Sequence, residues 1–278
     1  MKKLFILTLS ILFSYTGQAQ KNVAQKYSFH VGAFGGVSIY DGDLVDNKLE
    51  QIAETHPAFG AYLRFENGEY FSVRLSATYG RVSGDDRNSN TDWRTKRNLR
   101  FRSPVVEVAL IPEFNIYEIV LPKSGYKITP FVYAGIGGFW FNPKAEYNGE
   151  WVDLQQLGTE GQGLPGNEDL YSRVAISIPG GIGVKFKLSD YTTFTWETGF
   201  RFTNTDYLDD VHHLYPDLEL LKDARGQIAV DLSDRTTEDV PEIPTSITAG
   251  DTRSNGKLSD SFLFTGFSVS INLSSKSK

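Results

Sequence analysis

Cysteine is absent from this sequence of 278 residues. Disulfide bonds and catalysis by a thiol are therefore excluded. A bacterial lipid anchor is excluded as well, because no cysteine follows the apolar N-terminal segment. An exported chain of this length does not need disulfide bonds to bury a sufficient core.

Long apolar runs are also missing, apart from a short one at the N-terminus. Two lysines precede the apolar residues 4–15, and residues 17–19 have the composition of a cleavage site. This order is typical of a secretory signal peptide. The apolar run is shorter than the roughly 20 residues that a membrane-spanning helix needs. We predict a signal peptide at residues 1–19 and export of the remainder.

Basic residues are in the minority, with 28 Lys and Arg against 34 Asp and Glu and a formal net charge of −6 at pH 7. Domains that bind nucleic acids carry a basic surface. We therefore predict no nucleic-acid partner for this acidic, exported chain.

Regular alternation of apolar and polar residues is present, most clearly in residues 171–204. In residues 174–188 every even position is apolar or glycine, and residues 191–204 alternate in the same way. A period of two indicates β-strands. At ~3.3 Å per residue and a tilt of about 40°, arms of this length cross a hydrocarbon layer of about 30 Å.

The same alternation recurs in eight segments that are joined by unequal connections. The predicted strands are residues 27–40, 58–66, 70–82, 103–116, 127–141, 171–188, 191–204 and 261–273. Short turns alternate with long loops, and the long loops are residues 41–57, 83–102, 142–170 and 205–260. This asymmetry is typical of outer-membrane barrels, which have short periplasmic turns and long extracellular loops. We predict an all-β fold with one domain at residues 20–278, an eight-stranded antiparallel transmembrane β-barrel surrounded by lipid in the outer membrane.

Alternation alone does not determine whether the apolar face points outward to lipid or inward to a ligand, as in a soluble lipocalin-type barrel. Long strands of similar reach and alternating loop lengths favour the membrane barrel. Charges of both signs on the polar faces can pair inside a narrow lumen, which is then a packed polar network and not a pore. The predicted lumen network consists of Arg64, Arg74, Glu107, Glu113, Arg173, Lys185, Glu197 and Arg201.

Aromatic residues lie near many of the strand ends, where they suit the interfacial girdles of a membrane barrel. These residues are Tyr27, Tyr40, Tyr79, Trp140, Phe141, Tyr191 and Phe202. The fifth strand alternates less cleanly, because Phe131 and Tyr133 lie on its nominally polar face.

The densest polar cluster is residues 205–213, directly after the seventh strand. Its acids and two histidines could bind a divalent metal. Adjacent residues such as His212 and His213 point apart in a strand or turn, however, and Asp and Thr often cap turns. We interpret this segment as a structured acidic loop.

Two other loops do not fit the binding motifs that they partly resemble. Residues 40–44 lack the oxygen-ligand pattern of a calcium loop. Residues 157–163 are rich in glycine but do not lead from a strand into a helix, as a phosphate loop does, so their glycines indicate a tight loop with positive φ angles. We predict neither a metal nor a cofactor.

An enzymatic barrel is the least favoured class. Some outer-membrane barrels carry Ser, His and Asp near the outer rim, and three of the four histidines, His56, His212 and His213, lie in predicted outer loops. No nucleophile motif accompanies them. We predict a non-enzymatic protein, with a rim-active enzyme as an alternative.

Five stretches at or near the predicted outer loops are specific in combination: residues 38–44, 97–103, 141–143, 154–163 and 197–211. In them the chain resembles the PorG-type outer-membrane barrels of the type IX secretion system, a Gram-negative export apparatus. The resemblance extends over about residues 29–215 and returns in the last strand. Its family-motif loop positions are Tyr40, Gly42, Asp43, Leu44, Thr159, Glu160, Gly161, Gln162, Gly163, Thr205, Asp206, Tyr207, Leu208, Asp209 and Asp210.

The resemblance implies a structural, anchoring role without catalysis. Members of this family are thought to tie a periplasmic lipoprotein ring of the secretion and gliding machinery to the outer membrane. Partner contact is then expected on the periplasmic turns at residues 66–69, 116–126 and 188–191. The matching motifs lie instead on the outer loops, which either cap the barrel mouth or contact another outer-membrane component. An orphan barrel with a surface-binding or envelope-integrity role is the alternative.

Overall fold

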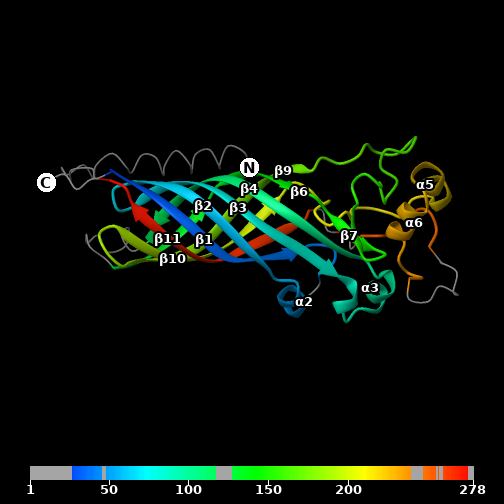
Figure 1. The fold of residues 1–278 in the computed structure, drawn as a ribbon, viewed down its shortest axis with the longest axis horizontal. Helices are drawn as coiled ribbons and strands as arrows, with labels where there is room; N and C mark the ends of the chain where they lie inside the picture. The colour runs from blue at the N-terminus through cyan, green and yellow to red at the C-terminus, as the bar shows by residue number, and fades with distance from the viewer. Residues whose placement is uncertain are drawn as a thin grey trace, which may run out of the picture.

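The chain forms a closed β-barrel whose strands are tilted and whose long connections extend from one end (Figure 1). This computed structural model describes residues 27–45, 48–116, 127–238, 247–254, 256 and 259–274. The predicted signal peptide and most of the predicted turn 116–126 lie outside the described residues. None of the described helices is long and apolar enough to cross a membrane.

The barrel wall has eight antiparallel strand positions, one of which is shared by two consecutive strands. The strands are β1 Tyr27–Asp41, β2 His56–Asn67, β3 Phe71–Asp85, β4 Arg100–Asn115, β5 Ile128–Ala134 with β6 Ile136–Phe141, β9 Val174–Lys187, β10 Thr192–Thr203 and β11 Ser261–Asn272. Each position pairs with the next along the chain, and β11 pairs with β1 to close the ring. The predicted eight-stranded antiparallel barrel is confirmed.

The fifth predicted strand is interrupted at Gly135, between β5 and β6. The amide of Gly135 donates to the carbonyl of Pro179 on β9 at 2.8 Å. Pro179 has no N–H group to return the hydrogen bond, so the ladder loses one bond at this point. The flanking pairs Ala134↔Gly180 and Gly137↔Ser177 keep the same register on both sides. The wall therefore continues through the interruption.

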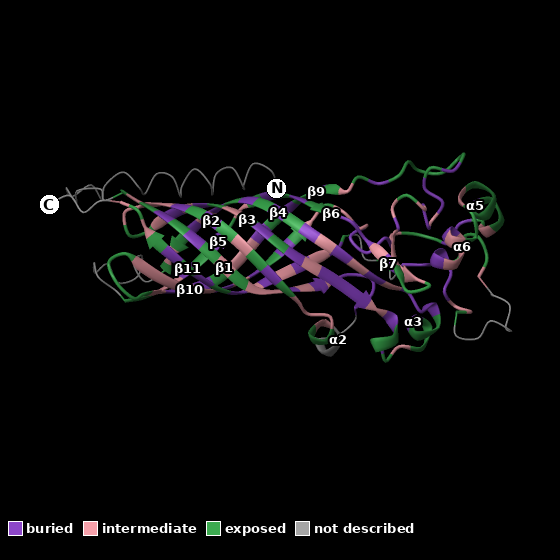
Figure 2. Cartoon of the chain, in the orientation of Figure 1, coloured by how far each residue is buried: buried purple, intermediate pink, exposed green. Residues whose placement is uncertain are grey.

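Apolar side chains cover the outside of the barrel, which Figure 2 shows as bands of exposed residues along the strands. Apolar wall residues around the circumference each expose about half of their surface. Examples are Phe29, Leu63, Leu75, Val108, Ile182 and Ile271. A continuous apolar exterior is stable in lipid and not in water. The apolar faces thus point outward, and the chain is a transmembrane barrel of the outer-membrane type.

Most of the aromatic residues near the strand ends are exposed on the outside, including Tyr27, Tyr79 and Tyr191. Tyr40 and Phe141 are exceptions because both are fully buried, so their assignment to the girdles was wrong. Both residues have the parity of the inward-facing positions in their strands, and parity decides the direction of a strand side chain.

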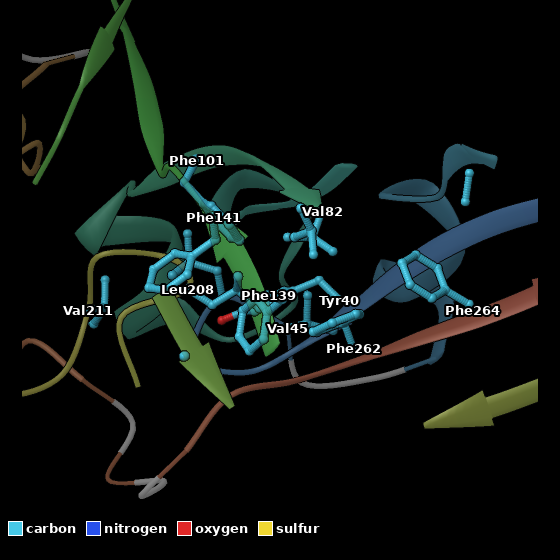
Figure 3. Packing of buried hydrophobic residues seen from close by; sticks show 14 of the residues in the cluster. Tyr40, Val45, Val82, Phe101, Phe139, Phe141, Leu208, Val211, Phe262 and Phe264 are labelled. Atoms are coloured by element: carbon cyan, nitrogen blue, oxygen red, sulfur yellow. The ribbon is translucent and has the colours of Figure 1, made fainter. Parts of the chain in front are cut away.

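The lumen is filled, and it differs between its two halves. Phe131 and Tyr133 turn inward beside the charged residues near the short turns, with Lys185 over the Phe131 ring. A cavity of about 10 Å³ borders Tyr62 and Arg74, which is room for about one water molecule. The half near the long connections is mainly apolar, so the expected wholly polar interior was wrong there. Its buried aromatic side chains, shown in Figure 3, include Tyr40, Phe101, Phe139, Phe141, Phe262 and Phe264.

The four long connections form a structured layer over the barrel mouth, which we call the outer cap: the described parts of residues 42–55, 86–99, 142–173 and 204–260. Its elements are α2 Lys48–Ala53, the 3-10 turn η2 Asp86–Asn88, α3 Asp92–Arg97, the hairpin β7 Lys144–Tyr147 and β8 Glu150–Asp153, α5 Leu218–Arg225 and α6 Gln227–Ser233. Hydrogen bonds of the Asp217 side chain to two amides cap the start of α5. Two small apolar clusters, around Leu232 and around Leu221, pack α6 and α5 onto the third connection. The outer cap is thus an ordered part of the fold and not a set of independent loops.

A pair of adjacent glycines in β9 offers a test of wall packing. A methyl group added at Gly181 falls 2.6 Å from Gly199 Cα and from the Tyr133 ring, whereas one added at Gly180 meets nothing within 4 Å. We expect Gly181→Ala to lower the free energy of unfolding by about 1–3 kcal/mol, because overpacking forces the wall apart. Gly180→Ala serves as the control and should match the wild type or exceed it by about 0.4–1 kcal/mol. Urea unfolding of the refolded barrel measures the stability of both variants. Equal unfolding midpoints would contradict the crowded surroundings of Gly181 and the open surroundings of Gly180.

Candidate functional site

Glu113 is the centre of the charged half of the lumen. Its fully buried carboxylate is 3.1 Å from Arg64 Nε, 3.0 Å from Arg74 Nε and 2.9 Å from Lys185 Nζ. Arg74 also donates to Glu197 Oε2 at 2.5 Å. These five side chains come from β2, β3, β4, β9 and β10, so one ion-pair network ties more than half of the wall together across the lumen.

A second ion pair lies nearer the barrel mouth. Arg201 Nε is 3.3 Å from Glu107 Oε2, and the hydroxyl of Ser177 donates to Glu107 Oε1 at 2.7 Å. Glu197 and Arg201 therefore both belong to the lumen charges, but they pair with different partners and not with each other. Burial makes the Glu113 network and the Arg201–Glu107 pair costly to break, because a partner left alone is an uncompensated buried charge.

Arg173 is not part of the lumen network, and its assignment there was wrong. The strand β9 begins at Val174, so Arg173 precedes the wall and lies at the outer rim. Its guanidinium donates to Asn142 Oδ1 at 3.1 Å, and about 31% of its side chain is exposed. The alternation of residues 171–188 begins before the strand itself does.

The family-motif residues come together in the outer cap. Leu44 and Leu208 are buried in the aromatic cluster at the barrel mouth (Figure 3 labels Leu208). The Thr159 hydroxyl donates to Asp210, and Gln162 accepts a hydrogen bond from the Glu160 amide. The Tyr207 ring stacks on the Tyr171 ring, and the amide of Asp260 donates to the carbonyl of Thr205. Gly158, Gly161 and Gly163 have positive φ angles, as the predicted tight loop requires.

Two buried arginines, Arg94 and Arg97, and the buried Asp86 organise the outer cap. Of these three, only Arg97 lies in a stretch that carries the family resemblance. Asp86 accepts hydrogen bonds from Arg94 Nε at 3.1 Å, from Arg97 Nε at 2.7 Å and from the Leu99 amide at 3.0 Å. Arg97 in turn donates to the carbonyls of Arg253 at 2.6 Å and of Asp43 at 3.2 Å. The second outer connection thereby holds the first and the fourth.

Arg253 makes the corresponding link to the third connection. Its Nη1 donates to Glu160 Oε1 at 3.0 Å and to the carbonyl of Asp210 at 2.6 Å. Its Nε donates to the carbonyl of Ser233 at 3.3 Å. Arg97 and Glu160 lie in stretches that carry the family resemblance, whereas Asp86, Arg94 and Arg253 differ from other charged residues of long loops by no sequence signal.

Four aspartates form a buried acidic cluster where the outer cap meets the wall: Asp43, Asp206, Asp209 and Asp260. The Tyr40 hydroxyl lies between two of them, at 2.5 Å from Asp209 Oδ2 and 3.1 Å from Asp260 Oδ1. The amide of Val211 donates to Asp209, and that of Leu208 donates to Asp260. The cluster thus collects charge from the first outer connection and from both ends of the fourth.

Burial changes the acidity of these groups. Desolvation raises the pKa of the Asp206 carboxyl to about 6, against the lowering effect of its hydrogen bond to His212. Desolvation raises the pKa of Asp210 to about 6 as well, although Arg253 opposes the shift. For Asp209 and Asp260, burial together with the neighbouring carboxylates holds the pKa well above its usual range. The negative charge of the cluster is therefore unfavourable unless a proton or a cation compensates it.

The two adjacent histidines do not point apart, so the expectation for them was wrong. The ring centroids of His212 and His213 lie 3.6 Å apart. Their segment is neither strand nor helix, so the opposite directions of successive strand side chains do not apply to it. The amides of both residues donate to Glu160. His212 Nδ1 lies 2.7 Å from Asp206 Oδ2.

Comparisons with known structures find other barrels at low identity. The chain is similar to Neisserial surface protein A, with 7% identity over 89% of this chain and 99% of that chain and a TM-score of 0.41. It is similar to Ail, the attachment invasion locus protein of Yersinia pestis, with 10% identity, the same coverages and a TM-score of 0.39. It is also similar to a major outer membrane protein of Thermus thermophilus, with 12% identity, the same coverages and a TM-score of 0.39.

Sequence comparison assigns the chain to a family. No curated protein matches it significantly. One family profile, described as "Domain of unknown function (DUF6089)", matches residues 2–225, which include seven of the eight wall positions and three of the four outer connections. The chain belongs to this DUF6089 family.

Proposed function

We propose that this protein is a non-enzymatic structural component of the outer membrane that anchors a periplasmic assembly. The resemblance to PorG-type barrels suggests that the assembly is the type IX secretion and gliding machinery, with a ring lipoprotein as the partner. The observation that carries an anchoring role is the filled interior, because a packed lumen under a structured cap suits a fixed scaffold better than a conduit.

The direction of the motif residues supports partner binding at the periplasmic end. The outer-loop motifs are used within the outer cap, where most of their side chains are buried and hydrogen-bonded to one another. They therefore account for the resemblance without an outward-facing surface.

The described periplasmic turns present accessible side chains. Leu188 in the β9–β10 turn is about two-thirds exposed, Tyr191 is about half exposed, and Glu69 in the β2–β3 turn is exposed. Gly68 has a φ of +70°, which makes the β2–β3 turn tight. Short, rigid turns of this kind lose little conformational entropy on binding, which favours a docking role.

The absence of catalysis remains part of this proposal. The strongest candidate for chemistry is His212, whose ring contacts Asp206, Tyr207 and His213. None of these described contacts is with a serine or threonine hydroxyl, which is the nucleophile of the Ser-His-Asp type of hydrolase.

Copurification tests the proposal. The tagged protein, recovered from its native host after mild crosslinking, should bring down a periplasmic ring lipoprotein. Leu188→Asp should reduce that recovery about tenfold or more, because the introduced carboxylate would have to be removed from water when the contact forms. Recovery of no such lipoprotein by the wild type contradicts the secretion role.

The matched control is Leu220→Asp in the outer cap, which is similarly exposed and lies at the other end of the molecule. It should leave recovery unchanged. Equal losses for both variants indicate a general defect in assembly, which heat-modifiable migration on gels detects independently.

A further inference from the structure

The buried acidic cluster has the geometry of a cation site. Asp43, Asp206 and Asp260 each offer one carboxylate oxygen, and these three oxygens all lie within 4.8 Å of one another. The three residues are between 0% and 5% exposed. They come from the first outer connection and from the two ends of the fourth, so no local turn explains why they meet.

A second observation comes from Asp206 alone. Its Oδ2 faces His212, whereas its Oδ1 is buried and has no hydrogen-bond partner among the described residues. The carboxylate that carries this atom is one of the three that converge. A buried carboxylate oxygen without a donor is costly, and coordination of a cation removes the cost.

Among the described residues, Asp209 and Asp260 receive hydrogen bonds from one phenol and two backbone amides. The Leu208 amide donates to Asp260 and the Val211 amide donates to Asp209. The single proton of the Tyr40 hydroxyl, which is 2.5 Å from Asp209 and 3.1 Å from Asp260, serves one of these two carboxylates at a time. These donors are neutral. The nearby buried guanidinium of Arg97 bonds to the carboxylate of Asp86 and touches Asp43 through its backbone carbonyl.

We propose that Asp43, Asp206 and Asp260 bind one divalent cation of the hard, oxygen-preferring class, and that Ca²⁺ is the ion that fits. Each Ca–O distance is about 2.4 Å, so the ligand oxygens of one Ca²⁺ lie no more than about 4.8 Å apart, and the three carboxylates meet this limit. The ligand oxygens come from carboxylates on separate segments, and Ca²⁺ tolerates such irregular sets better than Mg²⁺ does. The Tyr40 hydroxyl lies between Asp209 and Asp260 and helps to hold the Asp260 carboxylate in place.

Such an ion acts as a lock on the outer cap. It joins residue 43, just after β1, to residues 206 and 260, which follow β10 and precede β11. These three strands are neighbours in the wall, since β11 lies between β1 and β10. Cation binding therefore stabilises the closed arrangement of the cap over the barrel mouth, on the side exposed to the external medium.

Calorimetric titration tests the proposal. The mature, full-length barrel in detergent, stripped with EDTA, is titrated with CaCl₂. We expect one site per chain, with a Kd of about 10⁻⁴–10⁻³ M, as in extracellular calcium modules. Asp206→Asn and Asp260→Asn keep the size of the side chain and should each weaken binding about tenfold or more, because each removes one charged ligand. Trypsin cleavage within the cap should be slower with Ca²⁺ than with EDTA for the wild type only.

The matched control is Asp153→Asn, an acidic residue of the outer cap that pairs with Lys144 at 2.7 Å and is about one-third exposed. It should bind Ca²⁺ as the wild type does. The proposal fails if the folded wild type takes up no Ca²⁺ at about 5 mM, well above the Kd range expected for an external site. It also fails if Asp206→Asn binds Ca²⁺ as tightly as the wild type. If the variants do not fold, as judged by heat-modifiable migration, the Ca²⁺ titration of the folded wild type alone tests the proposal.

Discussion

Replacing Glu113 by Gln should lower the free energy of unfolding of the barrel by about 3–5 kcal/mol, the usual cost of removing one partner from a buried ion pair. The reason is geometric. Arg64, Arg74 and Lys185 all direct their charges to this carboxylate within 3.1 Å, and none of these side chains reaches solvent appreciably. Glutamine has the same shape, so the loss reports the charge and not the packing.

Urea unfolding of the refolded barrel in lipid vesicles, followed by tryptophan fluorescence, measures the effect. Glu69→Gln, an exposed glutamate in the adjacent turn, is the control and should stay within about 0.5 kcal/mol of the wild type. A double variant, Glu113→Gln with Lys185→Met, should recover part of the loss, because one of the uncompensated cations is removed. If the free energy of unfolding of Glu113→Gln lies within about 1 kcal/mol of the wild-type value, as for an ordinary surface substitution, the proposed role of the network is contradicted.

Asp86→Asn should open the outer cap without unfolding the barrel. Asp86 is fully buried and contacts the guanidinium groups of both Arg94 and Arg97, so its neutralisation removes the carboxylate that these two buried cations share. We expect a local loss of about 3 kcal/mol, because both guanidinium groups lose their contact with this buried carboxylate, and this loss corresponds to a roughly hundredfold increase in the open population. Arg97 also holds the first and fourth connections, so the opening should spread beyond the second.

Trypsin treatment of vesicle-embedded protein, with mass spectrometry of the products, measures the opening. Cleavage after Arg94 and Arg97 should become about a hundredfold faster, because proteolysis follows the population of the open form when closing is fast. Asp92→Asn, an exposed acid in the same segment, should leave the rate nearly unchanged. If the cleavage rates of the two variants agree, Asp86 does not organise the cap. Unchanged heat-modifiable migration should confirm that the wall itself stays folded.

The two networks have different consequences because they lie in different parts of the molecule. Glu113 joins strands of the wall across the lumen, so its loss weakens the whole barrel. Asp86 and Arg253 join the outer connections to one another, so their loss affects the cap first. Since the aromatic cluster at the barrel mouth lies between these regions, an opened cap exposes apolar side chains such as Phe101 and Phe141 to water.

The wall could be predicted from the sequence because its physical rule is local. A strand side chain points in or out according to its parity, and a membrane barrel must place apolar residues outside along its whole circumference. Alternation therefore determined the eight strands, their antiparallel order and most of the lumen charges. Long connections with short turns between them determined which end carries the cap. Even the inward direction of Tyr40 and Phe141 is contained in the parity, although their positions at strand ends suggested girdles.

Only the tertiary structure decided the contacts of the outer cap, because these depend on which distant residues meet. Asp86 finds Arg97 within its own connection, but Arg253 finds Glu160 across 93 residues. The connections have no periodicity that indicates burial, so a buried charge in them resembles an exposed one. The interruption at Gly135 likewise depends on the register that places Pro179 opposite. The convergence of Asp43, Asp206 and Asp260 is of the same kind: the sequence contained three separate acids, and closure of the barrel brought them to one point.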